Sequence, residues 1–337
     1  MTVREMSASD TPALAAHAGG GDTSPPARPR SRRRRGLGWS GRLEVLLLAG
    51  PAVIFFVGFV ILPVLMAAYY GFFRWSGFGP ATDFVGLKNY ITIFSDPNFQ
   101  SALLHNAFIV VMSLVLQGPI AIGLALLLNR KMRGQSVIRV LIFVPYVIAE
   151  VVVGTGFSLL LSTNGAANGM LDKLGLGSLT QDWLADPAIA IWTLMAILTW
   201  KYVGFAVILF LAGLQGIPEE LYEAAAIDGA SYWQIQRQIA LPLLAPTLRI
   251  WAFLSIIGAL QLFDLVYIIW GQYVSSVAGT NTMAIYMVVT GRNAGNFGYG
   301  NAVAVVIFVI SLVVALFYQR FVLRRDTAGA ITERGVQ

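Results

Sequence analysis

The sequence contains no cysteine, only two histidines and no recognisable set of catalytic residues. Without cysteine, the 337-residue chain cannot form a disulfide, a thiolate metal site or a cysteine nucleophile. His17 and His105 leave little for a histidine metal site or for a catalytic triad. We therefore expect no catalytic residue and no metal site in this chain.

A phosphate-binding loop of the G-K-[ST] type is also absent. The four lysines follow Leu87, Arg130, Asp172 and Trp200, and none follows a glycine. The chain does not bind ATP by that route, and we expect it to bind no cofactor.

Charge is scarce and apolar residues dominate. Hydrophobic residues make up 57% of the chain and charged residues 12%, and the mean hydropathy is +0.70. This composition predicts an integral membrane protein. The apolar blocks are continuous and about 20 residues or longer, which predicts six membrane-spanning helices rather than barrel strands. The predicted fold is therefore all-α, with spans at residues 45–72, 104–128, 137–161, 188–213, 247–271 and 301–323.

The basic residues predict the orientation in the membrane. If the N-terminus lies inside, only Arg74, Lys88, Lys173 and Arg292 fall outside. Lys201 lies within the fourth block, and the other 18 of the 23 basic residues fall inside. Because basic residues stay on the cytoplasmic side, we expect both termini to be cytoplasmic. The net charge of +6 mostly reflects this asymmetry and indicates no nucleic-acid partner.

The chain ends are expected to be tails. Residues 1–42 are rich in Ala, Gly, Pro, Ser and Arg without apolar periodicity, which predicts a disordered basic tail near anionic headgroups. The first apolar block is too long and too far from the N-terminus for a cleaved signal peptide, so it should stay as a membrane anchor. The predicted permease domain covers residues 43–324, and residues 325–337 form a second cytoplasmic tail.

A polar connector interrupts the apolar blocks at residues 214–246, on the predicted cytoplasmic side. Pro218 and the following acidic residues indicate a helix start. Asp228-Gly229 is a turn signal, and Ser231 with Gln234 has capping-box spacing. The connector is predicted to form two short helices joined by a tight bend at the membrane surface, followed by Pro242 and Pro246 at the entry to the fifth span.

The connector carries a fixed pattern, which consists of Glu223-Ala224-Ala225, Gly229, Ile239, Leu241 and Pro242. This pattern resembles the EAA signature of the membrane subunits of binding-protein-dependent ABC importers. Neighbouring patterns resemble sugar permeases of the maltose and glycerol-3-phosphate type: Leu262-Phe263-Asp264 with Val266-Tyr267, and Phe297-Gly298-Tyr299-Gly300. One departure is Gly271-Gln272-Tyr273-Val274, which stands where a Gly-Gly-Pro turn is often found.

The resemblance implies an ATP-driven permease that does not itself catalyse a reaction. The two short helices would dock on a separate ATPase dimer, which uses ATP and Mg. Glu223 would make the polar contact and Ala224 and Ala225 the close packing, while Asp228-Gly229 would form the bend. A second permease subunit, an extracytoplasmic solute-binding protein and the lipid bilayer are the other implied partners. A di- or oligosaccharide is the implied cargo, and the sequence does not identify it.

Ionisable residues inside the predicted bilayer are the second set of candidates. Glu150 and Lys201 each lie about 13 residues into antiparallel spans, near the midplane. They are interpreted either as an internal salt bridge or as direct contacts to the substrate.

Gln261, Asp264 and Tyr267 form the third set of candidates. Their spacing places them on one face of the fifth helix, where they could bind a sugar or act as polar contacts between helices. Tyr146, Trp200 and Tyr202 are weaker aromatic candidates, for which packing is the simpler interpretation.

Two alternatives to a sugar importer remain. The first is an ion-coupled secondary transporter or channel with Glu150, Lys201 and Asp264 as an ion relay. The second is an ABC importer for a solute other than a sugar. The relay predicts inverted repeats, of which the sequence shows none.

Overall fold

A computed structural model describes residues 39–130 and 132–323, and the side chains of residues 39–42, 45, 272–277 and 323 are not described. The predicted tails at 1–42 and 325–337 lie almost entirely outside the described residues. The chain divides into two compact units, residues 1–55 and 56–337. Within the first unit, the structure describes most of α1 (Trp39–Phe56). The second unit contains every other described element.

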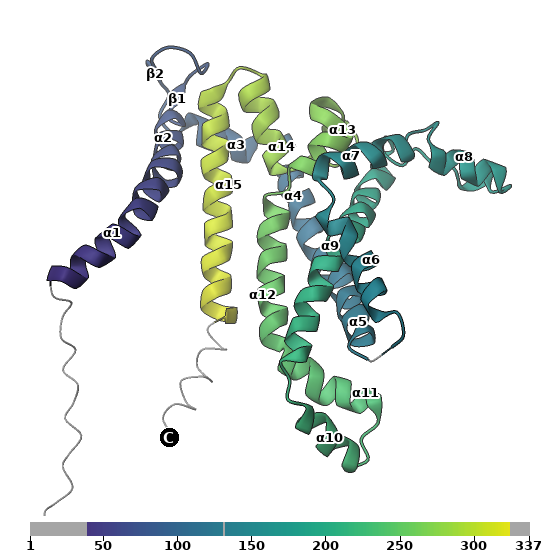
Figure 1. Ribbon diagram of the computed structural model, residues 1–337. Helices are drawn as coiled ribbons and strands as arrows, with labels where there is room; N and C mark the ends of the chain where they lie inside the picture. The colour runs from purple at the N-terminus through teal and green to yellow at the C-terminus, as the bar shows by residue number, and fades with distance from the viewer. Residues whose placement is uncertain (1–38, 131, 324–337) are drawn as a thin grey trace, which may run out of the picture. The chain divides into compact units, whose positions relative to one another are not determined.

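The described residues are almost entirely helical (Figure 1). The helices of the second unit are α2 (Leu62–Tyr70), α3 (Lys88–Ser95), α4 (Pro97–Met112), α5 (Gly118–Leu128), α6 (Gln135–Val147), α7 (Glu150–Leu160), α8 (Ala166–Lys173), α9 (Pro187–Gln215), α10 (Glu219–Ile227), α11 (Tyr232–Ile235), α12 (Leu241–Leu260), α13 (Asp264–Val277), α14 (Met283–Met287) and α15 (Phe297–Tyr318). Single π-helical turns cover Val57–Ile61, Ser113–Gln117, Gln236–Ala240, Val288–Asn293 and Gln319–Leu323, and a 3-10 turn covers Gly177–Leu179. Two short antiparallel strands, β1 (Phe73–Arg74) and β2 (Asp83–Phe84), pair Phe73 with Phe84.

Five helical segments are long and apolar enough to cross a membrane. They match the first, second, fourth, fifth and sixth predicted blocks, and they cover Leu46–Tyr70, Pro97–Leu128, Pro187–Gln215, Tyr232–Gly271 and Phe297–Val322. An all-α membrane protein is therefore confirmed.

The third predicted block is not one straight helix. α6 and α7 are bent by 92° relative to each other, so this block counts as a sixth span only if the bent pair is taken together. Ile148 and Ala149, between them, have extended backbone conformations. The expectation that Glu150 lies deep inside a continuous third helix is therefore wrong, because Glu150 is the first residue of α7.

The fifth block also differs from its prediction. α12 ends at Leu260, the backbone leaves the helix at Gln261, and α13 begins at Asp264. Gln261, Asp264 and Tyr267 therefore do not share one face of a continuous helix, as the spacing predicts. A third difference is that α11 does not stop before the membrane, since the π-helical turn Gln236–Ala240 joins it directly to α12.

The helix α9 lies at the centre of the second unit. More than half of its most apolar window is buried, compared with a third or less for the other four spans. Gly204 allows α9 to approach α6, since a Cβ atom at this position would lie only 2.1 Å from the carbonyl oxygen of Ile142. Apolar side chains of α9 belong to two of the three buried clusters, one with α12, α13 and α14 and the other with α5 and α12. α9 is thus the element against which the candidate sites are built.

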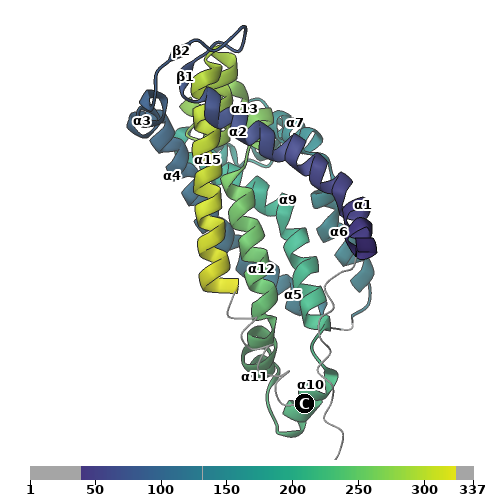
Figure 2. The same cartoon turned by 90° about the vertical axis from the view of Figure 1, so that its left-hand side faces the viewer.

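The two ends of the second unit carry different elements. α10 and α11 lie at one end, beyond α9 and α5, whereas α3, α14 and the two strands lie at the other (Figures 1 and 2). The buried Asn106 fixes this second end, because its amide nitrogen donates to Ala259 O over 2.6 Å and its amide oxygen accepts from Met283 N over 2.9 Å. One side chain of α4 thereby holds α12 and α14 together.

Candidate functional site: a docking surface, a buried lysine and a membrane cavity

The connector forms the predicted pair of helices. α10 begins after Pro218 with Glu219 and Glu220 in its first turn, where the positive end of the helix dipole stabilises acidic side chains. It ends at a left-handed Gly229 with φ of +79°, and Ala230 N–H donates back to Ala225 O. Ser231 and Gln234 then form the predicted capping box of α11. The bend is therefore built from backbone geometry that glycine adopts without strain.

The outer side of this helix pair is exposed and carries two large apolar side chains. Glu223, Ala224 and Gly229, which belong to the EAA pattern, are exposed, whereas Ala225 is half-buried. Ile227 and Trp233 are also exposed, with relative accessibilities of 85% and 74%. We call these five exposed residues the docking surface. Sequence reasoning missed Ile227 and Trp233, although two large apolar side chains in a polar connector are a usable signal of a contact site.

Three of the predicted coupling residues lie close to the membrane helices instead. Ile239 and Leu241 are half-buried at the π-helical turn and at the start of α12, and Pro242 is exposed in the first turn of α12. Pro242 lacks a backbone N–H, and the π-helical turn Gln236–Ala240 just before it carries the chain past this proline within one continuous helix. These residues thus shape the continuous path from α11 into α12 and do not form part of the docking surface.

The opposite side of the helix pair is attached to α5. Tyr232 of α11 donates a hydrogen bond to Leu126 O over 3.5 Å, and the guanidinium of Arg130 lies 3.9 Å from the centre of the Tyr232 ring. Tyr222 of α10 packs against the buried cluster that includes Leu128, and burial raises its pKa. Neither contact is predictable from spacing, because Tyr232 and Leu126 are 106 residues apart.

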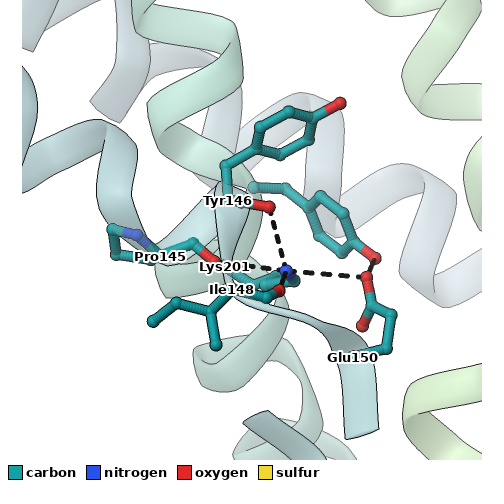
Figure 3. A network of polar contacts seen from close by, with 6 residues as sticks. Pro145, Tyr146, Ile148, Glu150 and Lys201 are labelled. Carbon is teal, nitrogen blue, oxygen red and sulfur yellow. Dashed lines mark hydrogen bonds and ion pairs between the residues drawn. The ribbon is translucent and has the colours of Figure 1, made fainter. Parts of the chain in front are cut away.

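Lys201 is the second feature, and it lies at the bend between α6 and α7. Its ammonium donates to the backbone oxygens of Pro145 (3.2 Å), Tyr146 (3.0 Å) and Ile148 (Figure 3). It also pairs with Glu150 Oε1 at 3.7 Å. The Lys201 side chain is only 2% exposed, so its charge is compensated within the protein.

The contacts of Lys201 account for the bend. The last carbonyls of α6 have no partner within their helix, and in an apolar environment each unpaired group is costly. The ammonium satisfies the carbonyl oxygens of Pro145 and Tyr146 and also that of Ile148, just beyond the helix, and Glu150 at the start of α7 compensates the charge. The predicted pairing of Glu150 with Lys201 is thus present, and the structure adds the carbonyls that the sequence does not reveal.

A cavity of about 240 Å³ lies next to this network. Its wall comes from α4, α6, α9, α12 and the π-helical turn Ser113–Gln117, and Leu262 also contributes. None of the described residues that line it carries a charged side chain. The polar lining residues are Ser113, Gln117, Tyr146, Thr199, Tyr202 and Ser255, and the aromatic ones besides tyrosine are Phe205 and Trp251.

Tyr202 connects the cavity with the buried ion pair. Its hydroxyl donates to Glu150 Oε1 over 2.7 Å, while its side chain lines the cavity. Tyr146, the second tyrosine of the wall, stacks on Phe205 at a centroid distance of 5.1 Å. Thr199 Oγ1 is buried, and no described residue forms a hydrogen bond with it. The cavity thus offers hydroxyl and amide groups together with aromatic rings, a combination that suits a polar organic ligand.

The other predicted path residues are absent from the lining of this cavity. Gln261 and Asp264 are exposed where α12 gives way to α13, and the Tyr267 ring stacks on Phe263 at 5.0 Å. Trp200, the third aromatic candidate, packs against Phe157. Sequence reasoning missed Ser113, Gln117, Thr199 and Ser255, whose positions depend on how α4, α9 and α12 meet.

Comparison with known proteins identifies the family. Residues 117–327 match the family described as the inner membrane component of binding-protein-dependent transport systems. The diacetylchitobiose uptake system permease protein NgcF of Streptomyces coelicolor is 32% identical over 90% of this chain and 89% of its own. The trehalose/maltose transport system permease protein MalF of Thermococcus litoralis is 31% identical over 81% of this chain and 91% of its own.

The fold agrees with this assignment. A crystal structure of a bacterial ABC transporter involved in the import of the acidic polysaccharide alginate matches 85% of this chain and 98% of its own, with a TM-score of 0.75 and 24% identity. This chain therefore belongs to the family of inner membrane components of binding-protein-dependent transport systems.

Proposed function

We propose that this chain is the permease subunit of an ATP-driven importer that moves a sugar received from an extracytoplasmic binding protein. The observation that carries the proposal is the docking surface, an exposed helix pair whose second helix continues without interruption into a membrane span. A separate ATPase dimer that grips α10 would move α12 directly. ATP and Mg would be bound by that partner, and this chain would hold no cofactor.

A sugar is the cargo class that the relatives and the cavity support together. The similar proteins named for trehalose/maltose and for diacetylchitobiose are sugar permeases. The cavity wall carries hydroxyl, amide and aromatic groups, which suit the hydroxyls and the ring faces of a sugar. We propose that Tyr202 and Tyr146 line the path, and that a second permease subunit completes it. Glu150 and Lys201 support this wall from outside the cavity.

The contacts do not favour an ion relay through Glu150, Lys201 and Asp264. Lys201 is committed to three carbonyls and one carboxylate, and Asp264 is exposed at the start of α13. The membrane sidedness follows from the basic residues, so we propose that the docking surface and both chain ends are cytoplasmic, in a bacterial cell membrane.

The test of the function is association with an ATPase. We expect an ATP-binding ATPase subunit to co-purify with this chain from its native membrane, and Glu223→Ala to weaken this association about tenfold, as expected for the loss of one charged contact. The matched control is Glu220→Ala, which removes an exposed acid from the same helix outside the docking surface. The wild-type complex should hydrolyse ATP faster when sugar-loaded binding protein is added. Uptake without any ATPase, driven by an ion gradient, would contradict the proposal.

A second prediction concerns the attachment of α11 to α5. Tyr232→Leu and Arg130→Gln each remove the contact between the tyrosine ring and the guanidinium. We expect each variant to lower binding-protein-stimulated ATP hydrolysis about threefold, because exposed cation–π contacts are worth ~0.5–1 kcal/mol. The double variant should be no worse than Tyr232→Leu alone, and Tyr232→Phe should retain most of the activity.

The exposed Arg133, three residues after Arg130 in the segment between α5 and α6, supplies the control variant Arg133→Gln. Losses that simply add in the double variant would show that Arg130 and Tyr232 act independently.

A further inference from the structure

The short helix α3 lies immediately before a membrane span. Only Asp96 separates Ser95, the last residue of α3, from Pro97, where the span Pro97–Leu128 begins. Asp96 has an extended backbone conformation and accepts a hydrogen bond from Asn98 N–H over 2.7 Å, so it caps the span. α3 therefore lies at one end of this span, next to the boundary between the membrane and water.

One face of α3 is held by the protein. Ile93 is fully buried in a cluster with side chains of α4 and α15. Asn89 donates from its amide to Gly71 O (2.9 Å) and to Phe73 O (3.1 Å), and the Tyr90 hydroxyl donates to Ala68 O over 3.3 Å. These contacts fix the rotation of the helix about its own axis and determine which side chains point away from the protein.

The remaining surface divides into an apolar and a polar stripe. Leu87, Ile91 and Phe94 are spaced four and three residues apart, which places them on one side of the helix, and they are 57–65% exposed. Lys88, Thr92 and Ser95 are also exposed and lie on the neighbouring side. α3 thus presents three sides, which are protein-facing, apolar and polar.

We propose that the apolar stripe of Leu87, Ile91 and Phe94 is inserted among the lipids at this membrane boundary, so that α3 is an interfacial helix. An amphipathic helix at this depth lies in the plane of the interface with its apolar side chains toward the acyl chains. Lys88, on the neighbouring side, then reaches the headgroup phosphates with its ammonium while its aliphatic stem stays near the apolar stripe. The occupant of this face is the phospholipid bilayer, the solvent that surrounds the adjacent span.

The proposed orientation of α3 also determines which way a second cavity faces. Lys88 and Thr92 of the polar stripe line a polar pocket of about 410 Å³ together with Asp96, Tyr286 and Asn296, among other residues. Figure 2 shows α3 at the same end as the strands and beside the start of α4. Insertion of the apolar stripe turns this pocket toward the aqueous phase, where its hydroxyl, amide and charged groups remain hydrated.

The absence of cysteine from the chain permits a direct test. Ile91→Cys and Phe94→Cys would be labelled with an environment-sensitive fluorophore in the complex, with its other subunits made cysteine-free, reconstituted in phosphatidylcholine–phosphatidylglycerol nanodiscs. Thr92→Cys and Ser95→Cys are the matched controls on the polar side. We expect blue-shifted emission that is quenched by brominated lipid at positions 91 and 94, and quenching by aqueous iodide at positions 92 and 95.

Two results would overturn the proposal. Iodide quenching at all four positions would place the whole helix in water. Protection of positions 91 and 94 from both quenchers, with a change on addition of binding protein or on removal of the second permease, would show that a protein covers this face. Leu87→Cys provides an additional probe of the apolar stripe if one of the other labels disturbs assembly. The fluorescence readout requires no transport, so its result is independent of whether the proposed function is correct.

Discussion

Replacement of Gly229 by valine is expected to leave the protein in the membrane but to reduce strongly the stimulation of ATP hydrolysis by sugar-loaded binding protein. Gly229 has a φ of +79°, and nothing lies within 4 Å of the position of a Cβ atom. The obstacle is therefore backbone strain and not lack of space. An L-residue in this conformation costs about 1–2 kcal/mol, and the cost is greatest for a β-branched side chain.

The strain at Gly229 should act on the bend between α10 and α11. Helix α10 is short and largely exposed, so tilting it away from α11 is the least costly way to relieve the strain. Such a tilt would move Glu223 and Ile227 relative to Trp233, and the docking surface would no longer match its partner. We expect stimulated ATP hydrolysis to fall at least about fivefold, the lower end of ordinary coupling energies.

A graded series of variants distinguishes this explanation from general instability. Gly229→Asn should retain most of the coupling, because asparagine tolerates the left-handed region, and Gly229→Ala should be intermediate. Gly295→Val is the matched control: Gly295 also has a positive φ (+67°) and free space around it, but it lies outside the connector, just before α15. Normal stimulation in Gly229→Val, measured in proteoliposomes, would show that the bend is not needed for coupling.

Replacement of Lys201 by methionine is expected to cause the largest loss of stability among the proposed substitutions. It would leave the partly buried carboxylate of Glu150 without its cation and three backbone oxygens without their shared donor. Removal of one partner from a buried ion pair costs ~3–5 kcal/mol. We expect a large drop in the unfolding temperature in detergent and a loss of sugar-stimulated activity.

The Glu150→Gln variant should be much milder. A glutamine oxygen can still accept the hydrogen bond from Tyr202, and Lys201 keeps its three carbonyl partners. The double variant Lys201→Met with Glu150→Gln should be no less stable than Lys201→Met alone, since the unpaired carboxylate is then gone. Lys173→Met, at an exposed lysine in the last turn of α8, is the control. Strictly additive losses of stability would contradict the pairing.

The agreement between sequence and structure is closest where the signals are local. The bend at Gly229 and the Ser231–Gln234 capping box depend on contacts within a few residues, and both agree with the prediction. The continuity of α11 with α12 differs from the prediction, because Pro242 in the sequence indicates the start of a new helix. The π-helical turn Gln236–Ala240 carries the chain past this proline without a break.

The third apolar block shows why hydropathy alone is insufficient. The hydropathy of residues 137–161 predicts one span, because hydropathy contains no information on which donors form hydrogen bonds with the backbone carbonyls. The bend is stabilised by Lys201, which lies more than 50 residues away on α9. The predicted face of Gln261, Asp264 and Tyr267 fails for a similar reason, since three-residue spacing implies a shared face only if the helix is unbroken.

The sequence by itself determined the membrane class, five of the spans, the two short helices of the connector and the absence of a phosphate loop, because each depends on composition or on short-range spacing. Only the tertiary structure decided the cavity, the bend between α6 and α7, the attachment of Tyr232 to α5 and the three-sided environment of α3. These features depend on which helices pack together and on which distant donor meets which carbonyl, and neither is encoded in local periodicity.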